Sequence, residues 1–139
     1  MAAAHDIASI GPRVLVVDDT ADTRELYAMC FRHDGFDVAE AEDGLEAIAS
    51  AQALPPDVII MDLAMPRLDG WLATKQLKAH HRTRDALVLV VTGQVIDADL
   101  QRARDAGADE VLTKPCSPRG LLAKVRAMLA LRMVASRSS

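Results

Sequence analysis

Short apolar runs alternate along the chain with longer segments in which apolar residues recur every three to four positions. The runs are rich in β-branched residues, which is typical of strands, whereas the longer spacing favours helices. The predicted strands are Arg13–Val17, Phe36–Glu40, Val58–Met61, Leu87–Val91 and Glu110–Thr113. Three of these strands are continuously apolar instead of alternating, which is typical of a parallel sheet covered on both faces.

Helical spacing follows each predicted strand. The helix-spaced groups are Leu26, Met29, Cys30 and His33; Leu45, Ile48 and Ala49; Ile96, Leu100, Ala103 and Ala106; and Leu121, Leu122, Val125, Met128 and Leu129. The segment Asp69–His80 is less periodic, but its length suits a helix. Residues that commonly begin or end helices lie at the expected boundaries: Asp43-Gly44, Pro55-Pro56, Gly107 and Pro118.

Five successive strand–helix units predict a doubly wound α/β fold with a five-stranded parallel sheet. Right-handed crossovers with helices on both faces require the strand order to reverse once. We therefore expect the order 2-1-3-4-5, a flavodoxin-like (βα)5 arrangement in which the first and third strands are neighbours. A chain of 139 residues, half of them hydrophobic, suits one domain. We expect a flexible leader over residues 1–11, the domain over 12–133 and a flexible tail over 134–139.

Polar residues follow four of the predicted strands and carry the candidate chemistry. Asp18 and Asp19 follow the first strand, Asp62 the third, Thr92 the fourth and Lys114 the fifth. Ligands of open α/β sheets bind beyond the carboxyl ends of the strands, where the strand order reverses. We therefore expect the acids of the first and third strands to face each other, with Thr92 one strand away and Lys114 reaching back to them.

Three neighbouring acids indicate a bound cation. Two like charges about 4 Å apart repel by roughly 4 kcal/mol at an effective dielectric near 20. Oxygen ligands without histidine or cysteine favour a hard ion, here Mg²⁺ with Mn²⁺ as an alternative. Such an ion would bring an anionic phosphoryl group to an aspartate, which is a known nucleophile for it, while Lys114 and Thr92 would contact the phosphoryl oxygens. Helix capping alone would not require the second acid of Asp18-Asp19.

Four motifs resemble those of response-regulator receiver domains: Val16-Val17-Asp18-Asp19, the ten residues Met61–Gly70, Val91-Thr92-Gly93 and Thr113-Lys114-Pro115. The resemblance covers roughly Arg13 to Leu131, and the chain is similar to stand-alone chemotaxis-type members. It implies that Asp62 accepts a phosphoryl group from a sensor histidine kinase or a histidine phosphotransfer protein. It also implies that Thr92 and Lys114 bind that group and that Mg²⁺ is held by Asp18, Asp19, Asp62 and the backbone carbonyl of Ala64.

The resemblance also implies how the signal leaves the domain. A downstream protein would bind the face formed by the helix near Ile96–Ala106, the strand Glu110–Thr113 and the helix near Leu121–Leu129. Family members catalyse only their own phosphorylation and dephosphorylation, so no enzyme acting on an external substrate is expected. Val111 and Cys116 stand where many members carry aromatic residues. A short, stiff Val111 predicts a smaller rearrangement of this face. We also expect a cis peptide bond before Pro115.

Composition limits the partners and the location. A net charge of −4 gives no basic surface for nucleic acid, and no apolar run approaches the length of a membrane span. The first residues lack the features of a signal peptide, so a cytoplasmic location is expected. Without a DNA-binding region in the sequence, output is expected through protein contact or phosphorelay. Cys30 and Cys116 lack metal-ligand spacing, and Cys30 is predicted to be a buried thiol.

Three other functions are alternatives to the phosphoacceptor. A flavodoxin-type carrier needs a glycine- and hydroxyl-rich loop after the first strand, but Asp18-Asp19 would repel a flavin phosphate. A small Mg²⁺-dependent phosphatase typically adds an acid two residues after its nucleophile, where this chain has Ala64. The third alternative is a receiver-like binding module that does not depend on phosphate, and the intact set of five polar residues argues against it.

Overall fold

A computed structural model describes residues 11–63, 70–93, 97–114 and 116–138 of the chain. Its centre is one sheet of five strands in the order β2-β1-β3-β4-β5, and every pair is parallel. The strands are β1 (Arg13–Val17), β2 (Asp37–Ala41), β3 (Val58–Asp62), β4 (Leu87–Thr92) and β5 (Glu110–Thr113). The doubly wound fold and the strand order 2-1-3-4-5 are confirmed.

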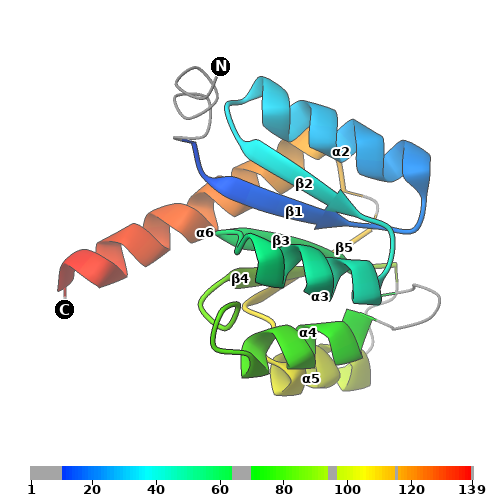
Figure 1. Cartoon of the computed structure of the whole chain (residues 1–139), viewed down its shortest axis with the longest axis vertical. Coiled ribbons are helices and arrows are strands. Elements are labelled where there is room, and N and C mark those ends of the chain that lie inside the picture. Colours follow the sequence, from blue (N-terminus) through cyan, green and yellow to red (C-terminus); the bar gives the residue numbers. More distant parts are fainter. Residues whose placement is uncertain (1–10, 64–69, 94–96, 115, 139) are drawn as a thin grey trace.

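Five helices cover the sheet in the described part of the chain. They are α2 (Ala21–His33), α3 (Gly44–Ala53), α4 (Gly70–Ala79), α5 (Asp97–Ala106) and α6 (Pro118–Ser138). Helices α2 and α6 lie on one face of the sheet, and α3, α4 and α5 lie on the other (Figure 1). None of these helices is long and apolar enough to cross a membrane.

The central strands divide their side chains between two apolar clusters, one on each face of the sheet. In β1, Leu15 and Val17 join the cluster beneath α3 and α4, whereas Val14 and Val16 join the cluster beneath α2 and α6. Successive side chains of a strand point to opposite faces, so a strand that is buried on both sides must be apolar throughout. This explains the continuous apolar runs in the sequence.

The apolar residues that predict α2 do not form its buried face. Leu26 is 51% exposed and Met29 is 65% exposed, whereas Tyr27 and Phe31 are buried. The aromatic side chains bury more apolar area than the aliphatic ones would, and they fill the space between β1 and α6. Cys30 is only half-buried, so the prediction of a buried thiol is wrong.

Helix boundaries agree with the predicted signals except at the end of the chain. The Asp43 side chain accepts the N–H of Glu46 at 2.8 Å and so caps α3, and Gly107 ends α5 with φ of 102°. Helix α6 continues to Ser138, so residues expected in a flexible tail are helical. Residues 1–10 of the expected leader lie outside the described residues, and the domain limits stay a prediction.

Gly70 packs the first turn of α4 against the end of β3. A Cβ at this position would lie 2.5 Å from the carbonyl oxygen of Asp62 and 2.8 Å from the Cα of Leu63. We expect Gly70→Ala to lower the free energy of unfolding by about 1–3 kcal/mol, because backbone atoms would have to move. Urea unfolding measures this change. Gly93→Ala is the matched control, since a Cβ at Gly93 meets nothing within 4 Å. An equal decrease in the free energy of unfolding in the two variants would contradict the close packing of Gly70 on the end of β3.

Candidate functional site

Three acids meet at the carboxyl end of the sheet. Strands β1 and β3 are neighbours, and Val17 pairs with Met61, so the residues after this pair emerge side by side. Carboxylate oxygens of Asp18, Asp19 and Asp62 lie within 4.8 Å of one another. Asp18 is 3% exposed and Asp62 is 5% exposed, whereas Asp19 lies open to solvent. Two acids of the cluster are therefore buried and the third is accessible from solvent. The structure brings together the acids that the predicted strand order places side by side.

Lys114 reaches this cluster from β5, two strands away from Asp62. Its Nζ lies 3.4 Å from Oδ2 of Asp62 and 4.0 Å from Oδ2 of Asp18. The backbone N–H of Lys114 donates to the carbonyl of Thr92 at 2.7 Å, and Thr113 is in register with Thr92. Thr92 itself is buried at the end of β4. The lysine and the threonine thus lie where the sequence predicts, joined by a main-chain hydrogen bond.

Asp18 is held in place by several hydrogen bonds. Its N–H donates to the carbonyl of Ala41 at 3.1 Å, and its Oδ1 accepts the N–H of Thr20 at 2.9 Å. Arg24 on α2 donates from Nη1 to the Asp18 carbonyl at 2.8 Å. One carboxylate oxygen therefore stabilises the turn into α2, and the other points toward Lys114. The sequence pattern does not single out Arg24, because its partner is a main-chain oxygen.

Tyr27 is a second residue that the sequence pattern does not single out. Its hydroxyl donates to the carbonyl of Cys116 at 3.0 Å and lies 3.5 Å from the Cys116 sulfur. Burial raises the pKa of the Tyr27 phenol far above its ordinary value, and Cys116 and the charges of Asp18 and Asp62 raise it further. Tyr27 therefore stays neutral and ties α2 to the segment that follows Lys114.

Two predictions at this site fall on residues outside the described ones. They are the carbonyl ligand at Ala64 and the cis peptide bond before Pro115. Both stay predictions. A second acidic group, formed by Glu42, Asp43 and Glu46, also brings its oxygens within 4.8 Å of one another. Its Asp43 is already engaged in capping α3, which gives this group a structural explanation.

Comparison with known proteins agrees with this architecture. A family model described as the response regulator receiver domain matches residues 14–126. The chain therefore belongs to the family of response regulator receiver domains, which are signalling modules of two-component systems. The resemblance seen in the sequence motifs is confirmed. The comparisons give no support to a phosphatase or to a phosphate-independent binding module.

Similar curated proteins are about twice as long as the matching part of this chain. The DNA-binding dual master transcriptional regulator RpaA of Synechocystis sp. is 38% identical over 118 residues, which cover 85% of this chain and 49% of RpaA. The phosphate regulon transcriptional regulatory protein PhoB of Escherichia coli K12 is 36% identical over 117 residues, 84% of this chain and 51% of PhoB. The chain thus spans about half the length of these relatives.

Solved structures of similar length share the fold. The chemotaxis response regulator CheY4 of Vibrio cholerae superposes with a TM-score of 0.81 at 31% identity, covering 84% of this chain and 98% of CheY4. A putative response regulator from Chloroflexus aurantiacus gives a TM-score of 0.79 at 30% identity, covering 86% of this chain and 98% of that one. The sheet and helices described above are therefore those of CheY-like proteins.

Tyr27 is the only tyrosine of the chain, so its ionisation can be followed directly by phenolate absorbance. An ordinary tyrosine ionises near pH 10. Since the folded protein keeps the phenol proton at higher pH than the unfolded chain does, the free energy of unfolding should fall as pH rises above about 10. Tyr27→Phe should remove this part of the pH dependence. Phenolate appearing near pH 10 while the far-ultraviolet circular dichroism stays native would contradict the assignment.

Proposed function

We propose that Asp62 accepts a phosphoryl group from a phosphohistidine of a sensor histidine kinase or a histidine phosphotransfer protein. A carboxylate oxygen of Asp62 forms the new P–O bond, the P–N bond of the donor breaks, and the leaving imidazole nitrogen keeps the electron pair. The observation that carries the proposal is the position of Asp62. It is a nearly buried carboxylate at a strand end, within 4.8 Å of two other acids and 3.4 Å from the Lys114 ammonium.

The acids fit a hard divalent cation. Asp18, Asp19 and Asp62 offer only oxygen ligands, and one lysine leaves an excess of negative charge among them. We infer that they hold Mg²⁺, with Mn²⁺ as an alternative, and that the carbonyl of Ala64 is a further ligand. When bound, the ion supplies the positive charge that lets an anionic phosphoryl group approach an anionic carboxylate.

Lys114 and Thr92 are proposed to bind the phosphoryl group once it is on Asp62. The Lys114 side chain is half-buried and already contacts Asp18 and Asp62. A short movement of its ammonium would therefore bring it to an oxygen of a phosphoryl group on Asp62. The Thr92 hydroxyl would donate a hydrogen bond to another phosphoryl oxygen. Since the Lys114 N–H binds the Thr92 carbonyl, a shift of one residue is transmitted to the other. The chain would catalyse only its own phosphorylation and its own dephosphorylation.

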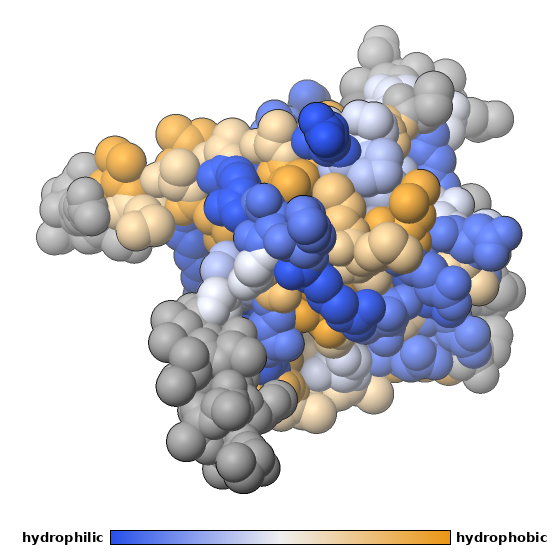
Figure 2. Space-filling model, turned by 90° about the horizontal axis from the view of Figure 1, so that it is seen from above, coloured by the Kyte–Doolittle hydropathy of each residue, from blue (hydrophilic) through white to orange (hydrophobic). Residues whose placement is uncertain are grey.

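The phosphodonor must reach Asp62, so its docking surface should lie beside the acids. A cleft of about 570 Å³ between α2 and the start of α6 is lined by Leu26, Met29, Cys30, His33, Ser117, Pro118 and Arg119. Figure 2 looks onto the side where α2 lies and shows apolar surface among polar residues. Two lining residues, Leu26 and Ser117, are the chain neighbours of Tyr27 and Cys116, whose hydrogen bond lies close enough to the acids for their charges to act on Tyr27. We therefore assign it to an apolar helix of the donor protein.

The downstream protein is proposed to bind the face formed by α5, β5 and α6. On this face Lys124 of α6 pairs with Glu110 of β5 at 3.2 Å. Val111 is half-buried and packs against the apolar cluster beneath α4. A β-branched side chain in a strand has restricted χ1 freedom, so this face should rearrange less than one with an aromatic residue at that position.

The acceptor is tested by phosphorylation with a small acyl phosphate in the presence of Mg²⁺. We expect one base-labile phosphoryl group per chain by intact-mass measurement, and none in Asp62→Asn. Asp85→Asn, which removes an exposed carboxylate from the turn before β4, is the control and should label like the wild type. If Asp62→Asn gains the same mass as the wild type, another residue is the acceptor.

The cation site is tested by thermal unfolding with and without Mg²⁺. Binding to the folded state alone should raise the melting temperature by mass action, and Asp19→Ala should lose most of this gain. Asp19 suits the test because it is exposed, so its removal leaves the pairing of Lys114 with the buried acids in place. Glu42→Ala, in the other acidic group, should keep the gain. A wild-type melting temperature that does not change with millimolar Mg²⁺ would refute the site.

A further inference from the structure

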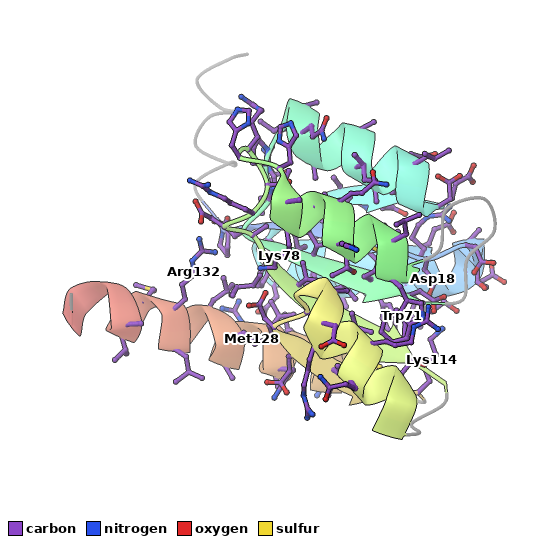
Figure 3. All side chains as sticks on the ribbon, turned by 90° about the horizontal axis from the view of Figure 1, so that it is seen from below. Asp18, Trp71, Lys78, Lys114, Met128 and Arg132 are labelled. Carbon is purple, nitrogen blue, oxygen red and sulfur yellow. The ribbon has the colours of Figure 1, made fainter. Side chains whose placement is uncertain are left out.

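A groove between α4 and α5 shares no lining residue with the cleft between α2 and α6 or with the acid cluster. It has a volume of about 370 Å³ and is lined by Trp71, Leu72 and Lys75 of α4 and by Arg102, Asp105 and Ala106 of α5. Trp71, the only tryptophan of the chain, is half-exposed in this lining. Figure 3 shows Trp71 between the ends of α4 and α5, on the side of the molecule where Asp18 and Lys114 also lie.

The groove carries positive charge that the rest of the described chain does not neutralise. Lys75 and Arg102 are both exposed, and neither forms an ion pair with any residue in the described ranges. The Arg102 guanidinium lies over the Trp71 ring, 5.0 Å from its centroid, and this cation–π contact holds it there. The one acid of the groove, Asp105, accepts a hydrogen bond from Gln101 on its own helix at 2.9 Å.

We propose that this groove binds an acidic segment of a partner protein. Carboxylates of the segment would pair with Lys75 and Arg102, and an apolar side chain would rest on Trp71 and Ala106. The volume is at the lower end of the range for small-molecule pockets and accommodates one or two side chains. A groove with two cations and one acid, on a chain of net charge −4, does not suit the regular polyanion of a nucleic acid.

The α4 side of the groove begins next to the residue that packs against the end of β3. Trp71 directly follows Gly70, which packs on the backbone of Asp62 and Leu63. The Thr74 hydroxyl donates to the Gly70 carbonyl at 2.7 Å and fixes this first turn of α4. A partner that contacts Trp71 would therefore lie close to the proposed acceptor, although none of the acids lines the groove. The inference goes beyond the proposed function and does not rest on it, because no residue of the acid cluster lines the groove.

The test uses the full chain and a short synthetic peptide of alternating glutamate and leucine. We expect a saturable change in the fluorescence of Trp71 and a shift of its indole N–H resonance. Lys75→Glu and Arg102→Glu should each raise the dissociation constant at least about tenfold, because like charges would then face each other. Arg104→Glu is the matched control, since it makes the same change of charge on the same helix but does not line the groove. It should bind like the wild type.

Three outcomes would overturn the proposal. The first is the absence of a saturable signal with the acidic peptide. The second is an equal loss of affinity in Arg102→Glu and Arg104→Glu, which would show that only overall charge matters. The third is equal or tighter binding of a single-stranded oligonucleotide with the same number of negative charges. Arg102→Gln, which removes the charge without reversing it, should give an intermediate loss if the pairing is direct. Circular dichroism of each variant checks that the fold is retained.

Discussion

The Lys114 ammonium lies between two carboxylates that are almost completely buried, 3.4 Å from Asp62 and 4.0 Å from Asp18. Without a cation, two carboxylates about 4 Å apart would repel by roughly 4 kcal/mol at an effective dielectric near 20. Lys114 offsets part of this repulsion and so stabilises the close approach of the acids. Yet a single ammonium does not neutralise three acids. The remaining negative charge suits a divalent cation, which would supply the positive charge that an incoming phosphoryl group needs.

This arrangement depends on the strand order, because only the reversal between β1 and β3 puts Asp18 beside Asp62. The helices then fix the geometry. Arg24 of α2 binds the Asp18 carbonyl, and Gly70 presses the start of α4 onto the Asp62 backbone. The N–H of Lys114 binds the end of β4. Main-chain contacts from several elements thus hold the site in place.

The sequence predicts the sheet and the cluster well because both follow from simple constraints. Continuous apolar runs require a covered parallel sheet, and polar residues at the strand ends must gather at one edge. The contacts of Tyr27 could not be predicted this way, because its partner Cys116 is 89 residues distant along the chain. Helical spacing in α2 predicts a helix, but it does not say that Tyr27 and Phe31 face the core in place of Leu26 and Met29. The last turns of α6 extend an established helix, which is easier than starting one.

The most direct test of the central claim is a crystal structure of the chain with Mg²⁺ and beryllium fluoride, which imitates a phosphoryl group on a carboxylate. We expect the beryllium on a carboxylate oxygen of Asp62 and the metal ion among Asp18, Asp19 and Asp62. The Lys114 ammonium should lie nearer to a fluorine than to the Asp62 carboxylate. Beryllium on another side chain, or a metal ion bound away from these three acids, would contradict the account.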